Sequence, residues 1–162
     1  MQIRKSVSIA TLFMTCTLVL FTGCANLPSP EVMKAETAGF QLPKLPAAGK
    51  AMVYVVRPSV LGGLARFNVF VDDQEAASEM GFTRASQYIY FQLTPGEHKI
   101  YSKAENWAET QVSVKAGDIV FIQQDTSMGV IMARNAIARI EELQGKYHVK
   151  TLTVGNIIKN DK

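Results

Sequence analysis

Apolar residues occur along this chain in short clusters, and turn-forming residues separate one cluster from the next. The clearest cluster runs from Ala51 to Arg57, is rich in β-branched and aromatic side chains, and stops at Pro58. Similar clusters follow at residues 67–71, 76–80, 87–93, 97–102, 107–114 and 118–124. Many short strands with regularly spaced turns are typical of sandwiches and barrels. The pattern predicts a mainly β domain, an antiparallel β-sandwich of about seven or eight strands.

The C-terminal part of the pattern is ambiguous, because residues 130–143 fit helical spacing and also partly fit two-residue alternation. We interpret this segment as a strand that continues to about Arg139. The segment 141–152 begins with two glutamates and carries His148 and Lys150 toward its end, an arrangement that the helix dipole favours. A short C-terminal helix is therefore predicted there.

A tight turn at Pro95-Gly96 is predicted to join two of the strands as a hairpin. In that register Leu93 faces His98, Phe91 faces Ile100 and Tyr90 faces Tyr101. Alternation then places Ile89, Phe91, Leu93 and Ile100 toward the core. It also places three tyrosines together on the outer face: Tyr88, Tyr90 and Tyr101.

The first 24 residues have the three parts of a secretory signal. Arg4 and Lys5 precede an apolar stretch from residue 7 to residue 21, and small residues follow before Cys24. A retained transmembrane helix needs roughly 20 apolar residues, and this stretch has only about 15. An ordinary secretory cleavage, with Cys24 as a plain thiol, is the alternative interpretation of the same pattern.

The tetrapeptide Phe21-Thr22-Gly23-Cys24 resembles the lipobox of bacterial lipoproteins. The resemblance implies that Cys24 is alkylated with diacylglycerol and becomes the first residue after cleavage. Each buried methylene of an acyl chain contributes about 0.8 kcal/mol, so a triacylated Cys24 would hold the protein on a membrane. Asp after the cysteine favours inner-membrane retention in Gram-negative lipoproteins, and Ala25 stands there instead. The expected location is the outer membrane, facing the periplasm.

Removal of the signal changes the charge and the cysteine count. The formal net charge falls from +3 to +1, because Arg4 and Lys5 leave with the signal. A nearly neutral chain without clustered cations is a poor nucleic-acid binder, so no nucleic-acid partner is expected. Cys16 also leaves, and with Cys24 acylated no thiol remains for a disulfide. The domain is therefore predicted to fold by packing alone.

The same observations divide the chain into four parts. Residues 1–23 are the predicted lipoprotein signal peptide, expected as a helix, and residues 24–50 are a proline-punctuated, extended tether. Residues 51–155 form the β-sandwich domain, and residues 156–162 form a C-terminal tail. Within the tether, residues 30–37 could form a short helix with Pro30 in its first turn.

Three motifs of the domain resemble a small bacterial lipoprotein family known as a domain of unknown function (family 2846 type). They are the strand 53–56 followed by Arg57-Pro58, the strand 69–71 followed by Asp72, and the strand 90–93 leading into Pro95-Gly96-Glu97-His98. The resemblance covers most of residues 51–152. It implies a compact β-sandwich with a short C-terminal helical piece on a lipid anchor, and it implies no reaction or ligand.

Candidate chemistry is sparse, and no catalytic residue, cofactor or metal is predicted. The two histidines, His98 and His148, are far apart in sequence, and no Cys or His-Glu constellation has metal-ligand spacing. The acidic residues between Asp72 and Glu79 are explained by turn chemistry. A non-enzymatic lipoprotein that binds an envelope protein or glycan is the leading hypothesis; an enzyme acting on envelope polymers and a carrier of a small apolar ligand are the alternatives.

Four side chains are the candidate partner-binding residues, namely Tyr88, Tyr90, Tyr101 and Arg57. An outward row of tyrosines offers a large rigid contact area with polar tips, which suits a protein or glycan interface. The competing interpretation is that the C-terminal helix covers the same tyrosines. For Arg57, the alternatives are an anion-binding guanidinium at a strand end and a stem that covers an apolar edge.

Overall fold

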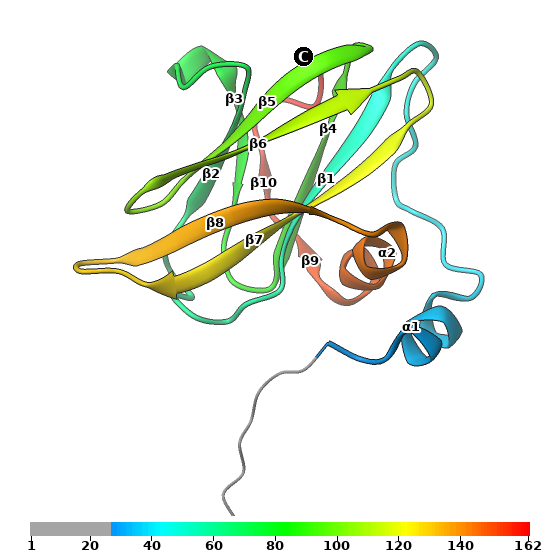
Figure 1. Ribbon diagram of the computed structural model, residues 1–162, viewed down its shortest axis with the longest axis horizontal. Helices are drawn as coiled ribbons and strands as arrows, with labels where there is room; N and C mark the ends of the chain where they lie inside the picture. The colour runs from blue at the N-terminus through cyan, green and yellow to red at the C-terminus, as the bar shows by residue number, and fades with distance from the viewer. Residues whose placement is uncertain (1–26) are drawn as a thin grey trace, which may run out of the picture.

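The computed structural model describes residues 27–162, and the predicted signal peptide and Cys24 lie outside these described residues. Two five-stranded sheets pack face to face as a sandwich (Figure 1). Two short helices, α1 (Pro30–Thr37) and α2 (Glu142–Thr151), lie at one side of it. The predicted sandwich fold is confirmed, as is the C-terminal helix.

The first sheet has the strand order β8-β7-β1-β4-β9. Its strands are β1 (Ala51–Arg57), β4 (Gln87–Leu93), β7 (Ile119–Met128), β8 (Ala133–Ile140) and β9 (Thr153–Val154). β1 pairs with β4 antiparallel and with β7 in parallel. All seven residues of β1 are buried, which explains why its sequence is a continuous apolar run without alternation.

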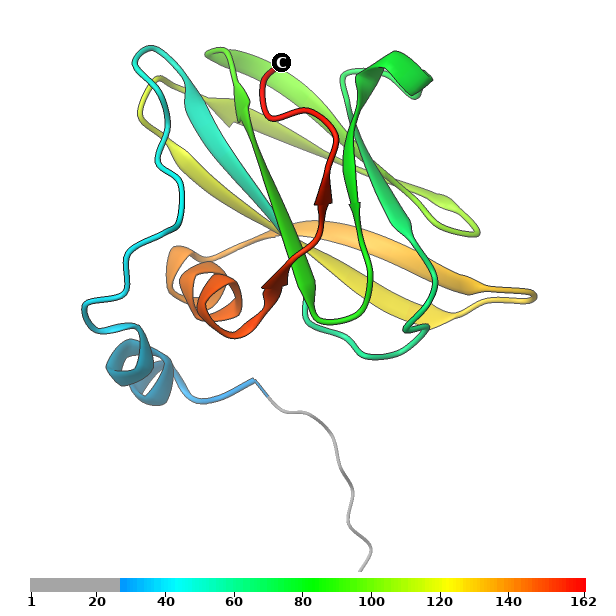
Figure 2. The same ribbon diagram turned by 180° about the vertical axis from the view of Figure 1, so that it is seen from behind.

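The second sheet has the order β10-β3-β2-β5-β6. Its strands are β2 (Phe67–Val71), β3 (Glu79–Thr83), β5 (Gly96–Lys103), β6 (Trp107–Val114) and β10 (Asn156–Ile157), with a 3₁₀ turn, η1 (Ala76–Ser78), before β3. The predicted hairpin after β2 is present, but its second strand begins at Glu79, because residues 76–78 form the 3₁₀ turn. The two strands beyond the predicted eight are the two-residue β9 and β10, which close the open side of the sandwich (Figure 2).

The predicted hairpin at Pro95-Gly96 is wrong. β4 pairs with β1 and β9, whereas β5 pairs with β2 and β6, so the chain crosses from one sheet to the other at this point. A Pro-Gly pair supplies a sharp change of direction in either case, and the inward-facing pattern is the same for both. The four inward residues are accordingly buried in the core as predicted: Ile89, Phe91, Leu93 and Ile100.

Tyr88 and Tyr90 therefore lie on the outer face of the first sheet, and Tyr101 lies on the outer face of the second. This separation follows from the same crossing, because residues that alternate outward on β4 and β5 now point to opposite sides of the sandwich. The predicted continuous row of three tyrosines does not exist.

Residues 38–50 pack along the first sheet instead of forming a free spacer (Figure 1). Phe40 and Leu42 pack on the outer apolar cluster of this sheet. The Tyr54 hydroxyl accepts from the Lys44 N–H at 3.0 Å and donates to the Lys44 carbonyl at 2.6 Å. The proline-rich sequence indicated an extended chain correctly, yet it carried no signal of this docking.

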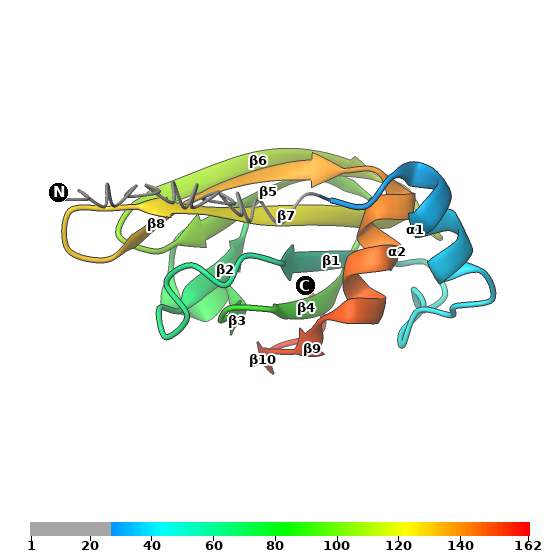
Figure 3. The same ribbon diagram turned by 90° about the horizontal axis from the view of Figure 1, so that it is seen from below.

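The helix α1 is part of the same packing. Ser29 caps it by accepting from the Val32 N–H at 3.4 Å, and α1 lies against α2 (Figure 3). Both apolar clusters of the fold, one between the sheets and one outside the first sheet, are built within residues 40–157. Residues 27–162 thus contain a complete core.

Candidate functional site

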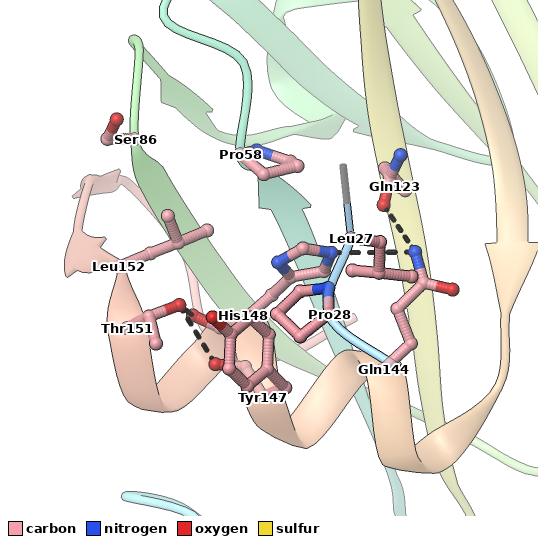
Figure 4. Close-up of a pocket in the computed structure, with 10 residues that line it drawn as sticks. All are labelled: Leu27, Pro28, Pro58, Ser86, Gln123, Gln144, Tyr147, His148, Thr151 and Leu152. Carbon is pink, nitrogen blue, oxygen red and sulfur yellow. Dashed lines mark hydrogen bonds between the residues drawn. The ribbon is translucent and has the colours of Figure 1, made fainter. Parts of the chain in front are cut away.

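A hollow of about 360 Å³ lies between α2 and the neighbouring loops (Figure 4). The helix α2 contributes one wall, β7 contributes a glutamine, and the chain just before α1 closes one side. The lining residues are Leu27, Pro28, Pro58, Ser86, Gln123, Gln144, Tyr147, His148, Thr151 and Leu152. The wall is mixed, with amide, imidazole and hydroxyl groups beside proline and leucine side chains.

The helix places its polar side chains in the hollow through simple spacing. Gln144, His148 and Thr151 are separated by four and three residues, so they share one face of α2. The helix can lie close to the sheet because Gly145, buried on its inner side, leaves room for the Phe121 ring. The position of α2 thus depends on Gly145, a residue type that helix propensity alone disfavours.

Hydrogen bonds fix the amides and the imidazole relative to one another. The Gln144 side-chain amide donates to Gln123 Oε1 at 2.9 Å and faces His148 Nε2 at 3.5 Å (Figure 4). An imidazole nitrogen that accepts from an amide must be unprotonated, so this arrangement fits neutral His148. Burial acts in the same direction and lowers the pKa of His148, while Asp125 opposes the shift.

We expect the stability of the domain to fall in mild acid because of His148. Its pKa is lower in the folded chain than the ordinary 6.5 of the unfolded chain. As the pH falls below about 6.5, the unfolded chain takes up a proton on His148 before the folded chain does. The free energy of unfolding therefore decreases between about pH 6.5 and the lower pKa of the folded chain. The decrease is at most about 1.4 kcal/mol per pH unit.

Urea unfolding at about pH 7.5 and about pH 5.5 measures this loss, and His148→Gln should reduce it. Tyr147→Phe is the matched control, because it changes the neighbouring residue of the hollow and keeps His148. An equal loss in the wild type and in His148→Gln would contradict the assignment.

Tyr88 and Tyr90 do not present a free surface. Tyr88 is buried and Tyr90 is half-buried in the outer apolar cluster, where both lie beside Tyr54 at ring-centroid distances of 6.2 and 5.8 Å. Burial raises the pKa of Tyr54 to about 12 and also raises that of Tyr88. Residues 38–50 and α2 cover this face, so the competing interpretation of a covered face fits these two tyrosines.

Tyr101 is half-buried on the opposite face of the sandwich. Its nearest aromatic partner is Trp107, edge-on at 6.5 Å, and Trp107 in turn packs on Phe70 at 5.2 Å. Tyr101 is thus the only one of the three predicted tyrosines outside the covered face, and its role in partner binding stays a prediction.

Arg57 is fully buried. Its guanidinium is therefore not at the surface, where it could bind an anion, and its stem does not cover an exposed apolar edge. Its guanidinium donates to the carbonyls of Ala65, Leu61 and Gly62 at 2.7, 2.9 and 2.9 Å and lies 3.7 Å from the Phe67 ring centroid. Loss of hydration lowers the pKa of Arg57 to about 10. The side chain holds the loop between β1 and β2 from inside.

His98 is likewise engaged within the fold. Its Nδ1 lies 3.1 Å from both carboxylate oxygens of Asp72, and its Nε2 lies 2.9 Å from the Thr94 carbonyl.

Asp73 accepts from the Glu75 N–H at 2.9 Å, which supports the predicted turn role of the acidic residues. Among residues 27–162, no group of three or more His, Cys, Asp or Glu side chains could hold a metal ion.

Within the described part of the chain, no helix combines the length and apolar character that a membrane crossing requires.

Sequence reasoning missed the two glutamines of the hollow. Gln144 and His148 have the four-residue spacing that a helix brings together, which is a usable signal once the helix is predicted. Gln123 belongs to β7, and only the packing of α2 on this strand brings it near.

Two comparisons with known proteins cover most of the domain. An "Uncharacterized protein" of Haemophilus influenzae (strain ATCC 51907 / DSM 11121 / KW20 / Rd) is 25% identical over 137 residues, which cover 84% of this chain and 78% of that protein. The family described as "Protein of unknown function (DUF2846)" matches residues 47–137, from just before β1 into β8, and the resemblance inferred from the strand and turn motifs is confirmed. Because this match spans more than half of the sequence, the chain belongs to the DUF2846 family.

Proposed function

We propose that the chain is a lipid-anchored cell-envelope lipoprotein, facing the periplasm from the outer membrane, whose sandwich is a non-enzymatic binding or structural module. The observation that carries the proposal is the sequence Phe21-Thr22-Gly23-Cys24 at the end of an apolar stretch that follows Arg4 and Lys5. The lipid on Cys24 supplies the attachment, and the folded domain then needs no membrane span.

The packing of residues 30–50 gives this anchor a short reach. Leu27, which lines the hollow beside α2, is the third residue after Cys24. Three extended residues span at most about 11 Å. A lipid on Cys24 therefore holds the domain close to the membrane surface, in contrast to the free spacer that the prolines suggested.

The hollow beside α2 supports a binding role. Two amides, a neutral imidazole and three hydroxyl-bearing side chains next to apolar walls suit an uncharged polar partner such as a glycan or a peptide segment. An enzyme is the less favoured candidate, because both ring nitrogens of His98 already have partners, and the guanidinium of Arg57 is turned to loop carbonyls.

Metabolic labelling with palmitate tests the anchor. The wild-type chain should incorporate the label, and Cys24→Ala should abolish it, because the thiol that accepts the diacylglycerol is gone. Mass spectrometry of the N-terminal peptide should show the acyl groups on Cys24.

Cys16→Ala is the matched control, since Cys16 lies inside the predicted signal and leaves with it. This variant should be labelled as strongly as the wild type. A wild-type chain that takes up no palmitate, or a Cys24→Ala chain that keeps the label, would refute the proposal.

A further inference from the structure

Two loops of the sandwich expose an unusual number of large apolar side chains. The loop from residue 58 to residue 66 joins β1 and β2, and residues 128–132 form the tip of the β7–β8 hairpin. Leu64, Val130 and Ile131 are 91%, 90% and 88% exposed. We call the following seven residues the apolar tips: Val60, Leu61, Leu64, Met128, Val130, Ile131 and Met132.

The two loops are neighbours in space. A Cβ placed on Gly62 would lie 2.6 Å from the Cβ of Ala133, and residues of both loops line a hollow of about 250 Å³. The hairpin projects at the end of the sandwich away from α1 and α2 (Figure 3). The apolar tips therefore form one projecting surface, not two scattered groups.

Internal hydrogen bonds already satisfy much of the backbone of these loops. Arg57 donates to three carbonyls of the first loop, as described above. Glu105, in the β5–β6 turn, accepts from the N–H groups of Val130, Ile131 and Met132 at 3.0, 2.8 and 2.7 Å. These three bonds hold the pKa of Glu105 down at about 2. A peptide group that is bonded internally loses less when it leaves water for an apolar medium.

The residues of the two loops themselves carry only positive charge, but the Glu105 carboxylate lies against the hairpin tip. Residues 58–66 and 127–134 contain no Asp or Glu, and each segment ends with an exposed arginine, Arg66 or Arg134. Exposed Lys103 lines the same small hollow as Arg66. Cations at the base of apolar loops complement a bilayer with anionic headgroups, because the apolar side chains enter the interface while the charges stay at the phosphates.

We propose that the apolar tips dock on a lipid bilayer, with Arg66 and Arg134 at the anionic phosphates. This docking surface goes beyond the lipid on Cys24; its hairpin tip projects away from α1 and α2, whereas Pro58, the first residue of the β1–β2 loop, shares a hollow with Leu27 (Figure 3). A projecting aliphatic surface with arginines at its base suits a lipid bilayer. The test below distinguishes this partner from a protein.

Vesicle flotation of residues 25–162, which lack Cys24 and hold the complete core, tests the docking surface without any acyl chain. We expect the protein to float with vesicles of phosphatidylethanolamine and phosphatidylglycerol. The double substitution Val130→Ser with Ile131→Ser should lower the vesicle partition coefficient at least about tenfold, because two apolar side chains no longer enter the interface. Arg66→Gln with Arg134→Gln should weaken binding to these vesicles, and added salt should do the same.

Leu45→Ser is the matched control. Leu45 is also apolar and 67% exposed, but it lies beside Ile119 at the start of β7, whereas Met128 is at its end. This variant should bind vesicles as the wild type does, and urea unfolding checks that every variant is folded.

Three results would overturn the docking surface: no flotation of the unsubstituted protein, an equal loss in Leu45→Ser, or a dimer in sedimentation that the Val130 and Ile131 substitutions abolish. Because this protein carries no Cys24, failure here leaves the palmitate test unaffected. Equally, absence of palmitate on Cys24 does not change the flotation result.

Discussion

Arg57→Ala is expected to lower the free energy of unfolding by about 2–4 kcal/mol. The substitution removes the donors of three loop carbonyls, each of which costs about 1–3 kcal/mol if it stays buried and unpaired. It also removes the packing of the side chain on the Phe67 ring. Two effects reduce the total: water can reach some of the carbonyls, and the unfavourable burial of the guanidinium, seen in its lowered pKa, is relieved.

Two further variants separate the contributions of Arg57. Arg57→Met keeps an apolar stem of similar length, so it should lose the hydrogen bonds but leave only a small cavity, and it should cost less than Arg57→Ala. Arg57→Lys keeps the charge but cannot bond three carbonyls with one planar group. Urea unfolding gives the energies, and hydrogen exchange of residues 58–66 should accelerate in all three variants. A lysine variant as stable as the wild type would show that the guanidinium fork does not hold the loop.

The burial of Arg57 illustrates what the sequence could not provide. The apolar run before it predicted β1 correctly, with Arg57 as its last residue. An arginine at that position is nonetheless expected at the surface, because burying a charge is costly. Only the folded β1–β2 loop, which turns its carbonyls inward, makes the burial tolerable.

Strand positions were predictable and strand partners were not. Alternation in residues 87–93 identified the inward side chains correctly, since alternation depends only on the local backbone. The partner of that strand depends on where the next strand goes after Pro95, and a sharp turn serves a hairpin and a crossing equally well. The parallel pairing of β1 with β7 likewise joins segments more than 60 residues apart, for which the local pattern has no signal.

The candidate site follows the same division. The helix spacing that brings Gln144 near His148 is local, so it was available from the sequence once α2 was predicted. The cover over Tyr88 and Tyr90 comes from residues 38–50, whose prolines indicated an extended chain but not the face on which it would pack. The apolar tips were also hidden, because Val130 and Ile131 have the same composition as a buried strand.

Gly145→Ala is expected to destabilise the domain by about 2–3 kcal/mol, although alanine is the better helix former by about 1 kcal/mol. The added Cβ would lie 2.1, 2.3 and 2.6 Å from Cγ, Cδ1 and Cβ of Phe121, distances that real Cβ atoms do not adopt. Phe121 cannot easily move, because it is buried and stacks on Tyr54 at a centroid distance of 5.5 Å. The helix must therefore shift away from the sheet.

Gly63→Ala is the matched control, because the nearest atoms to its added Cβ are at 3.7 and 4.0 Å, and it should change stability by less than about 0.5 kcal/mol. In the double variant with Phe121→Leu, the smaller side chain should relieve part of the clash. The stability loss of the double variant should therefore be smaller than the sum of the losses in the two single variants. A Gly145→Ala domain more stable than the wild type would mean that helix propensity dominates and that α2 is not held against Phe121. Since α2 forms a wall of the hollow, its displacement should also change the environment of His148, which the chemical shifts of the imidazole would report.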